Sequence, residues 1–238
     1  MKQPSISAAI KKILPHSLKR GLKKVYFSAH DLLGVFSKTS GKTHLPPKSR
    51  TFIFGDGDFN VIGELYLKRF KQYGMRPNDT VLDVGCGIGR MAIPLTTYLS
   101  EGHYEGFDCE KSGIDWCRKN ITPHFPNFTF THVDLFNKEY NPQGKITSTE
   151  FRFPYQDASF DFVFLSSVFT HMLPHDLEHY LAEIARVTKP KGTILVTYYL
   201  FDATYANTRR GALPFEHNYD THRINNIETP EAAIAYSI

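Results

Sequence analysis

The feature that most constrains this chain is a stretch in which three glycines alternate with other residues, Gly85, Gly87 and Gly89. The residues before it, 81–84, are mostly apolar and suit a strand buried on both faces. Glycine has no Cβ, so the backbone after this strand can turn sharply, adopt positive φ and let a ligand lie directly against it. A helix is expected next, over 91–99, with its N-terminal N–H groups facing an anionic group. The stretch therefore predicts a cradle for a small polar cofactor.

The spacing of these glycines narrows the choice of cofactor. A dinucleotide-binding fingerprint has glycine at its first, third and sixth positions, but the sixth position counted from Gly85 is Arg90. A nicotinamide-dependent dehydrogenase is therefore the weaker alternative. Asp83 adds an acidic residue inside the strand, two positions before the first glycine.

Strand-like and helix-like segments alternate along the rest of the chain. Further strands are expected over 103–107, 128–133, 162–165 and 193–200, the last one after a turn at 189–192. Helices are expected over 58–73, around Ile114 to Cys117, and over 174–187. The inward residues should be Val61, Ile62, Leu65, Tyr66 and Phe70 in the first helix and Leu177, Leu181, Ile184 and Ala185 in the last. This alternation predicts an α/β fold, a Rossmann-like, doubly wound and mostly parallel sheet.

Polar residues follow three strands at their carboxyl ends, the edge at which open α/β sheets bind ligands. Asp108 lies 23 positions after Gly85, where a carboxylate can accept both hydroxyl protons of a ribose; it can also simply cap the next helix. Asp134 can accept a hydrogen bond from an adenine amino group, with Leu135 and Phe136 flanking the base, or serve as a turn residue. Ser166 and His171 follow the fourth strand.

Taken together, residues 78–200 resemble the catalytic core of the class I S-adenosylmethionine-dependent methyltransferases, in the subgroup called type 11. The resemblance rests on the glycine loop with Asp83, on Asp108 and Asp134 at strand ends, and on two further motifs, Phe153-Pro154-Tyr155 through Phe160-Asp161 and Arg186 through Gly192. It implies S-adenosyl-L-methionine as cofactor. The residues it implies as cofactor contacts are Asp83, Gly85, Cys86, Gly87, Gly89, Arg90, Asp108, Cys109, Asp134, Leu135 and Ser166.

The resemblance also implies a methyl transfer reaction. The run Ser167–Met172 is similar to a bacterial branch suspected of modifying sugars or lipid-linked glycans, so the expected acceptor is a hydroxyl of a small or lipid-linked, glycan-type molecule. His171 is the candidate general base, with orientation of its loop or capping of the next helix as the alternative. No metal is expected, because His175 and His179 lack the glutamate of the HExxH pattern.

The chain departs from this family near its end. Such a fold adds two antiparallel strands after the fifth, but only 38 residues follow Leu200, and 229–235 reads as a loop entering a helix. Strands six and seven are therefore expected to be absent or truncated. This leaves open a second class of function, a catalytically inactive scaffold that the basic N-terminal arm tethers to a membrane.

Charge is distributed unevenly along the chain. Residues 1–50 hold 11 Lys and Arg against one acidic residue, which leaves 17 basic and 23 acidic residues for the predicted methyltransferase domain, 51–238. Apolar and basic residues recur at helical spacing over 6–36, a pattern typical of a helix lying on an anionic membrane or of a packed helix with a solvated basic face. The mildly acidic domain argues against nucleic acid as a partner.

The cellular compartment is also suggested by composition. Three cysteines without CxxC spacing fit a reducing compartment, and no apolar run of 18 residues exists. We therefore expect a cytoplasmic protein, peripheral at the inner face of the membrane if the arm binds there. The oligomeric state cannot be derived from the sequence.

Overall fold

The computed structural model describes residues 45–51, 58–138, 140–202 and 215–238. The chain divides into two compact units, residues 1–59 and 60–238. In the first unit, the described segment contains one helical turn, α3 (Lys48–Thr51). The predicted basic arm with its helices over 6–36 lies outside the described residues.

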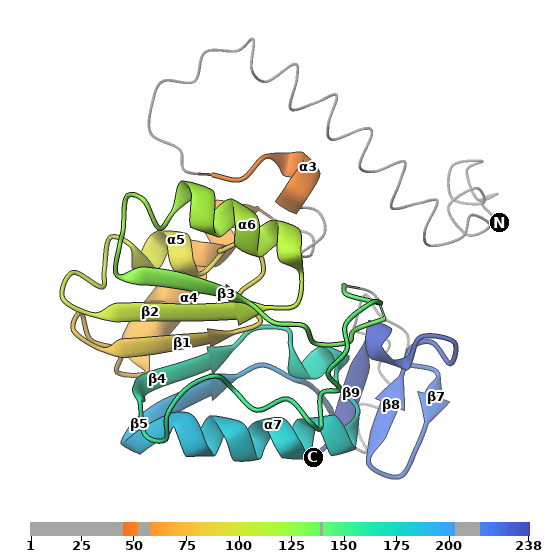
Figure 1. The fold of residues 1–238 in the computed structure, drawn as a ribbon. Helices are drawn as coiled ribbons and strands as arrows, with labels where there is room; N and C mark the ends of the chain where they lie inside the picture. The colour runs from red at the N-terminus through yellow and green to blue at the C-terminus, as the bar shows by residue number, and fades with distance from the viewer. Residues whose placement is uncertain (1–44, 52–57, 139, 203–214) are drawn as a thin grey trace, which may run out of the picture. The chain divides into compact units, whose positions relative to one another are not determined.

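The second unit is built on a five-stranded sheet in the order β3-β2-β1-β4-β5, with every neighbouring pair parallel (Figure 1). Its strands are β1 (Thr80–Val84), β2 (His103–Asp108), β3 (Phe128–His132), β4 (Phe160–Leu165) and β5 (Thr188–Val196). This confirms the predicted Rossmann-like fold. All five carboxyl ends therefore meet at one edge of the sheet, so the polar residues that follow these strands lie along the same edge.

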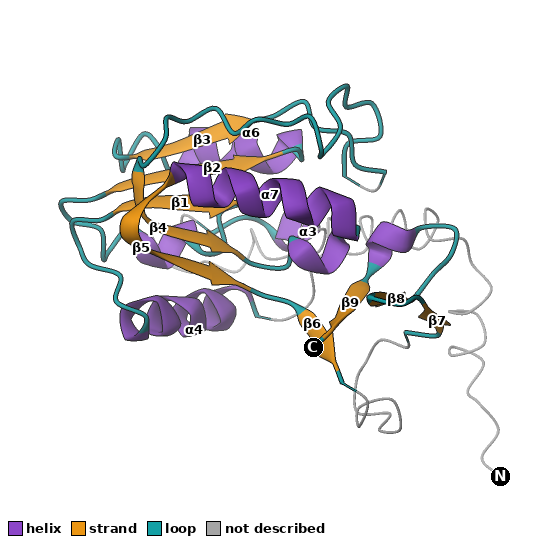
Figure 2. Ribbon diagram, turned by 90° about the horizontal axis from the view of Figure 1, so that it is seen from below, coloured by secondary structure: helices purple, strands orange, loops and turns teal. Residues whose placement is uncertain are grey.

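Helices cover both faces of this sheet, and strands β4 and β5 lie between two of them, α4 (Phe59–Gln72) and α7 (Pro174–Val187) (Figure 2). On one face, the Phe70 ring of α4 packs on Phe162 and Phe164 of β4, with ring centroids 5.6 and 4.4 Å apart. On the other face, Ile184 of α7 shares a core cluster with Val163, the strand residue between those two phenylalanines. Because successive side chains of β4 point to opposite faces of the sheet, this strand packs against both helices.

Two predicted helix faces differ from the observed ones. In α4 the buried residues are Gly63, Leu67 and Phe70, whereas Val61 is 66% exposed. In α7 the inward residues include Tyr180, Ile184 and Val187, and the prediction that Leu181 and Ala185 face inward is wrong. Tyr180 takes the inward position because its ring packs against Phe153 at 5.1 Å between centroids, which turns Leu181 toward solvent.

The helix after the glycine loop is much shorter than predicted. Instead of spanning 91–99, α5 runs only over Ala92–Leu95. The hydroxyls of Thr96 and Thr97 donate to the carbonyls of Ile93 and Pro94, at 2.7 and 3.0 Å. Such bonds between side chain and backbone compete with helix formation, and Pro94 supplies no N–H. A helix of four residues has little dipole, so it contributes less to anion binding than predicted.

Helix α6 (Lys111–Asn120) lies between β2 and β3 in the chain, as predicted. The turn predicted at 189–192 is instead a bulge inside β5: Phe160 pairs with Thr188 but Phe162 pairs with Thr193, and Lys191 has φ of 68°. The strand therefore begins earlier than 193 and ends at Val196, before the predicted end at 200.

After β5 the chain forms a second, four-stranded sheet in the order β6-β9-β8-β7. Its strands are β6 (Tyr199–Phe201), β7 (His217–Asn218), β8 (His222–Ile224) and β9 (Ile234–Ser237), and a short 3-10 helix, η4 (Pro230–Ala232), precedes β9. The predicted helix at 229–235 is therefore wrong beyond one turn, because residues 234–237 pair with β6 and β8. Within the described residues, β5 remains an edge strand of the main sheet, and the second sheet lies beyond the carboxyl ends of the main strands (Figures 1 and 2).

Among the described residues, none of the helices is long and apolar enough to cross a membrane.

Gly63 provides a test of how closely α4 packs on the segment after the glycine loop. A Cβ at this position would lie 2.7 Å from the Arg90 carbonyl oxygen and 3.2 Å from Pro94 Cγ. Alanine is a better helix former by about 1 kcal/mol, but forcing atoms into a packed site costs about 1–3 kcal/mol. We therefore expect Gly63→Ala to lower the midpoint of urea unfolding, and Glu64→Ala, the exposed neighbour, to leave it nearly unchanged. A rise in the midpoint for Gly63→Ala would contradict this packing.

Candidate functional site

The glycine loop after β1 has the conformation that its sequence predicts. Gly85, Gly87 and Gly89 have φ of 77°, 57° and 78°, a region that residues with a Cβ rarely adopt. The loop turns back onto β2, since the N–H groups of Gly85 and Cys86 both donate to the carbonyl of Phe107, at 2.9 and 3.1 Å. A Cβ on Gly85 would lie 2.5 Å from Val168 Cγ2, so this cradle exists only with glycine.

Asp108 at the end of β2 holds the loop in place. Its Oδ2 accepts from the Gly87 N–H at 2.8 Å, and its Oδ1 accepts from the Glu110 N–H at 2.7 Å. Burial raises the pKa of this carboxyl above its ordinary value, while the two N–H donors favour the ionised form. A carboxylate has about four acceptor positions, so each oxygen keeps capacity for a further donor.

The alternative that Asp108 caps the next helix does not hold. The N-cap of α6 is Glu110, whose side chain accepts from the Gly113 N–H at 2.6 Å. Asp108 is therefore available to a ligand at the loop, and the ribose role stays a prediction.

Asp83 lies in a different environment from Asp108. It is 2% exposed beneath the loop, and its Oδ2 accepts from the Tyr104 hydroxyl at 2.6 Å. Burial raises the pKa of Asp83 to about 8. The same surroundings raise the pKa of the Cys86 thiol, again mainly by burial. Both residues therefore support the loop from below, and their predicted contact with the cofactor stays a prediction.

The residues predicted around an adenine lie at the ends of β2 and β3. Cys109 and Leu135 are half-buried and pack against the core cluster on the α7 face. Asp134 is exposed, and its backbone carbonyl accepts from the N–H groups of Lys145 and Ile146, both at 3.0 Å. Phe136 is also exposed. Residues 134–136 thus form a surface beside Asp108, with the Asp134 carboxylate on the solvent side.

Arg90 and Ser166 lie near Tyr66, which the sequence assigned only to the apolar side of α4. The Ser166 hydroxyl donates to the Tyr66 hydroxyl oxygen at 2.9 Å. Burial lowers the pKa of the Arg90 guanidinium, and Tyr66 acts in the opposite direction. Because Ser166 and Tyr66 are 100 positions apart, no local pattern predicts their contact.

His171 occupies a 3-10 turn, η2 (Phe169–His171), after β4, and its protonation pattern follows from its partner. Its Nδ1 lies 2.8 Å from the backbone carbonyl oxygen of Glu231. A carbonyl only accepts, so Nδ1 carries the proton in this contact. The neutral imidazole then has its lone pair on Nε2, as a general base requires.

The sequence did not point to the two neighbours of His171. One is Glu231 in η4, and the other is Tyr140, whose ring meets the imidazole edge to face with centroids 6.4 Å apart. Tyr140 belongs to the insertion after β3, whose fold is set by bonds between Asn137 and Asn141. The length of the 137–155 insertion could have drawn attention to it.

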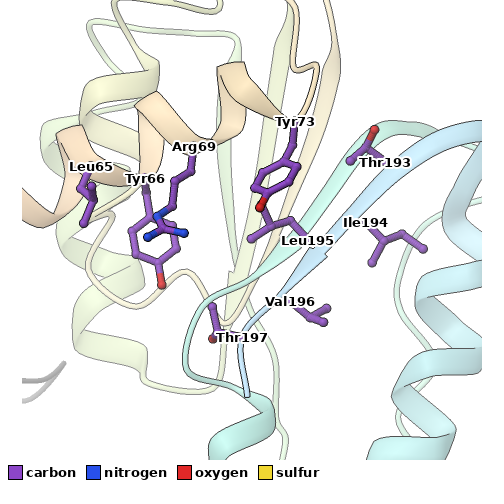
Figure 3. Close-up of a pocket in the computed structure, with 9 residues that line it drawn as sticks. All are labelled: Leu65, Tyr66, Arg69, Tyr73, Thr193, Ile194, Leu195, Val196 and Thr197. Carbon is purple, nitrogen blue, oxygen red and sulfur yellow. The ribbon is translucent and has the colours of Figure 1, made fainter. Parts of the chain in front are cut away.

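A hollow of about 590 Å³ lies elsewhere, between α4 and the outer edge of β5 (Figure 3). Tyr66, Arg69 and Tyr73 of α4 line it on one side, and residues 193–197 line it on the other. It shares Tyr66 with the cluster around Ser166 but contains no residue of the glycine loop. The polar groups at the strand ends, rather than this hollow, therefore define the candidate active site.

Within the described residues, no three side chains of His, Cys, Asp or Glu come together in a way that could hold a metal ion. His175 instead lies 3.5 Å from the Asp176 carboxylate.

Comparison with known proteins agrees with this geometry. Residues 81–192 match a family model described as a methyltransferase domain. The chain is 33% identical over 117 residues to phthiotriol/phenolphthiotriol dimycocerosates methyltransferase 1 of Mycobacterium ulcerans, covering 49% of this chain and 36% of that protein. It is 30% identical over 117 residues to the fatty-acid O-methyltransferase of Mycolicibacterium smegmatis, with the same coverage. The chain thus spans about a third of the length of the curated relatives it matches.

Among solved structures, the PH0226 protein from Pyrococcus horikoshii OT3 superposes with a TM-score of 0.50 at 20% identity, covering 76% of each chain. This likeness shows the fold.

The parallel sheet, the glycine loop and the strand-end carboxylates thus define a Rossmann-like methyltransferase domain. Residues 81–192 are similar to the methyltransferase domain family, in agreement with the resemblance seen in the sequence. The glycine cradle and the remaining acceptor capacity of Asp108 fit S-adenosylmethionine, the predicted cofactor.

The raised pKa of Asp83 makes stability depend on pH. The carboxyl titrates near 3.8 when unfolded and near 8 when folded, so the folded state holds a proton that the unfolded state has lost between these values. The wild-type free energy of unfolding should therefore fall as pH rises, by up to about 1.4 kcal/mol per pH unit over this window. Asp83→Asn, which is neutral throughout, should lie closest to wild type near pH 4 and exceed its melting temperature near pH 9. Asp115→Asn on the surface of α6 is the control, and an equal gain at both pH values would contradict the assignment.

Proposed function

We propose that this protein transfers a methyl group from S-adenosylmethionine to a hydroxyl oxygen of a small or lipid-linked acceptor. The observation that carries the proposal is the His171 imidazole, whose Nδ1–H is committed to the Glu231 carbonyl, so that Nε2 is the basic atom. A methyl acceptor with a hydroxyl needs such a base, because its proton must leave as the oxygen forms its new bond.

The residues that would hold the cofactor come from the loop and strand ends. Asp108 would accept hydrogen bonds from the ribose hydroxyls with the acceptor capacity it retains, and Asp134 and Leu135 would meet the adenine. The glycine loop would allow close approach of the backbone. Arg90 and Ser166 would lie toward the methionine portion, where a guanidinium suits a carboxylate.

The cofactor, when bound, supplies an electrophilic methyl carbon on a sulfonium, and the S–CH₃ bond breaks as the O–CH₃ bond forms. The residues of this chain orient the acceptor, exclude water and receive the hydroxyl proton at His171 Nε2. Well-aligned reactants gain roughly 7–11 kcal/mol from proximity and orientation alone. Orientation is therefore the main contribution expected of the protein.

The names of the relatives support a lipid acceptor. They include methyltransferases named for phthiotriol and phenolphthiotriol dimycocerosates and for fatty acids. Because the chain spans about a third of those proteins, their names support only the chemical class of the acceptor, a lipid.

Asp108 is the first residue to test. Asp108→Ala removes the acceptor for the ribose hydroxyls and leaves the Gly87 N–H without its partner. Hydrogen bonds to a charged group contribute about 1.5–3 kcal/mol each, so affinity for S-adenosylhomocysteine should fall by at least tenfold. Isothermal titration calorimetry measures this, with Asp115→Ala on the surface as the matched control. Unchanged affinity in Asp108→Ala would remove this residue from the cofactor site, and absence of binding to the folded wild type would defeat the proposed function.

His171 is tested by separating chemistry from binding. His171→Ala should keep the wild-type affinity for S-adenosylhomocysteine within about twofold. It should slow formation of S-adenosylhomocysteine from S-adenosylmethionine and octane-1,2-diol by about 10²- to 10⁴-fold, the usual contribution of a general base. His175→Ala, a nearby histidine with an exposed side chain, should retain turnover. Parallel loss of affinity and turnover in His171→Ala would indicate that His171 only supports the fold.

A further inference from the structure

Three segments that are distant in sequence meet at His171. The insertion after β3 contributes Tyr140, whose ring contacts the imidazole. The C-terminal turn η4 contributes the Glu231 carbonyl. The same two segments are joined directly, because Lys138 Nζ donates to the backbone carbonyl of Glu228 at 2.5 Å. The two segments that contact the imidazole are thus also bonded to each other, independently of their contacts with His171.

The side chain of Glu231 is unusual at this position. Its Oε2 atom is buried and has no hydrogen-bond partner among the described residues. A buried acceptor without a donor costs about 1–3 kcal/mol, more when it is charged. Because the backbone carbonyl of this residue already binds His171, its carboxylate is separated from the imidazole by no more than that hydrogen bond and the length of its own side chain.

The charges around Glu231 do not supply the missing donor. Asp176, at the start of α7, has only 18% of its side chain exposed and repels Glu231 electrostatically. His175 and His179 of the same helix favour the ionised form of Asp176. Both rings have partners other than Glu231, because His175 contacts Asp176 and His179 Nε2 lies 3.0 Å from the Phe151 carbonyl oxygen. Lys138 is bonded to Glu228. Within the described residues, Glu231 Oε2 is therefore not hydrogen-bonded to a cation.

We propose that the Glu231 carboxylate accepts a hydrogen bond from the methyl acceptor, beside the hydroxyl that His171 deprotonates. This inference rests on the proposed function and narrows it to acceptors with a second hydrogen-bond donor next to the reacting hydroxyl, as in a vicinal diol or a sugar. Such a site rejects an analogue that lacks the second donor, because Oε2 is then left buried and unpaired.

The same charges select against an acidic acceptor. A carboxylate bound at His171 would approach Glu231, which already experiences the charge of Asp176, and like charges in a partly buried site repel strongly. The site therefore favours O-methylation of an alcohol over esterification of an acid.

Three ligands of equal chain length test this directly: octane-1,2-diol, octan-1-ol and octanoate. Their affinities are measured by calorimetry on the full chain saturated with S-adenosylhomocysteine, a readout that needs no turnover. We expect the diol to bind at least tenfold more tightly than the mono-alcohol, and octanoate to bind most weakly. In Glu231→Gln the diol preference should shrink to about threefold or less and octanoate should gain affinity. Glu228→Gln, which changes a carboxylate in the same segment, should behave as wild type.

The outcomes separate this inference from the proposed function. Equal binding of diol and mono-alcohol by the wild type, retention of the full diol preference in Glu231→Gln, or tight binding of octanoate by the wild type would each overturn the inference. So would binding of S-adenosylhomocysteine with no binding of any of the three ligands. Failure of the folded chain to bind S-adenosylhomocysteine would instead overturn the proposed function. The wild-type ligand series decides the question even if Glu231→Gln does not fold.

Discussion

The contact on which the site depends is the one between the Asp108 carboxylate and the Gly87 N–H. It ties the turn after β1 to the end of β2, while Asp108 also accepts from Glu110. The loop can close onto this carboxylate only because its glycines adopt positive φ. A half-buried acid with two N–H donors remains suited to accept further hydrogen bonds, so one interaction both shapes the cradle and prepares it for a ligand.

The two halves of the site come from different parts of the chain. The proposed cofactor half is built by consecutive strand ends, from Gly85 to Leu135, around one edge of the parallel sheet. The proposed acceptor half is assembled from the insertion with Tyr140, the turn with His171 and the C-terminal turn with Glu231. The second sheet matters for this assembly, because β9 follows η4 directly and the Tyr236 hydroxyl of β9 donates to the carbonyl of Met172, next to His171.

Much of the fold could be predicted from sequence, and the errors have physical causes. The five strands were found from their apolar runs, of which those in β1 and β4 are buried on both faces. Helix α7 was found with its correct ends. The α5 helix was overestimated because Thr96 and Thr97 bond back to the preceding turn, a competition that apolar spacing does not reveal. Leu181 was misplaced because Tyr180, amphipathic and easily read as a surface residue, fills the space beside Phe153. Residues 229–235 read as a loop entering a helix, but pairing with β6 and β8 places the last two of them in strand β9, Ile234–Ser237.

The sequence by itself determined the cofactor side of this protein. Its glycines, strand ends and Asp108 act through local conformation and through the common direction of parallel strands, which a linear pattern encodes. Only the tertiary structure decided the acceptor side. His171 and Glu231 are 60 positions apart, and Ser166 and Tyr66 are 100 apart, so their contacts exist only after the chain has closed on itself. A neutral histidine can carry its proton on either nitrogen. The carbonyl that folding places against Nδ1 of His171 leaves Nε2 as the proposed base.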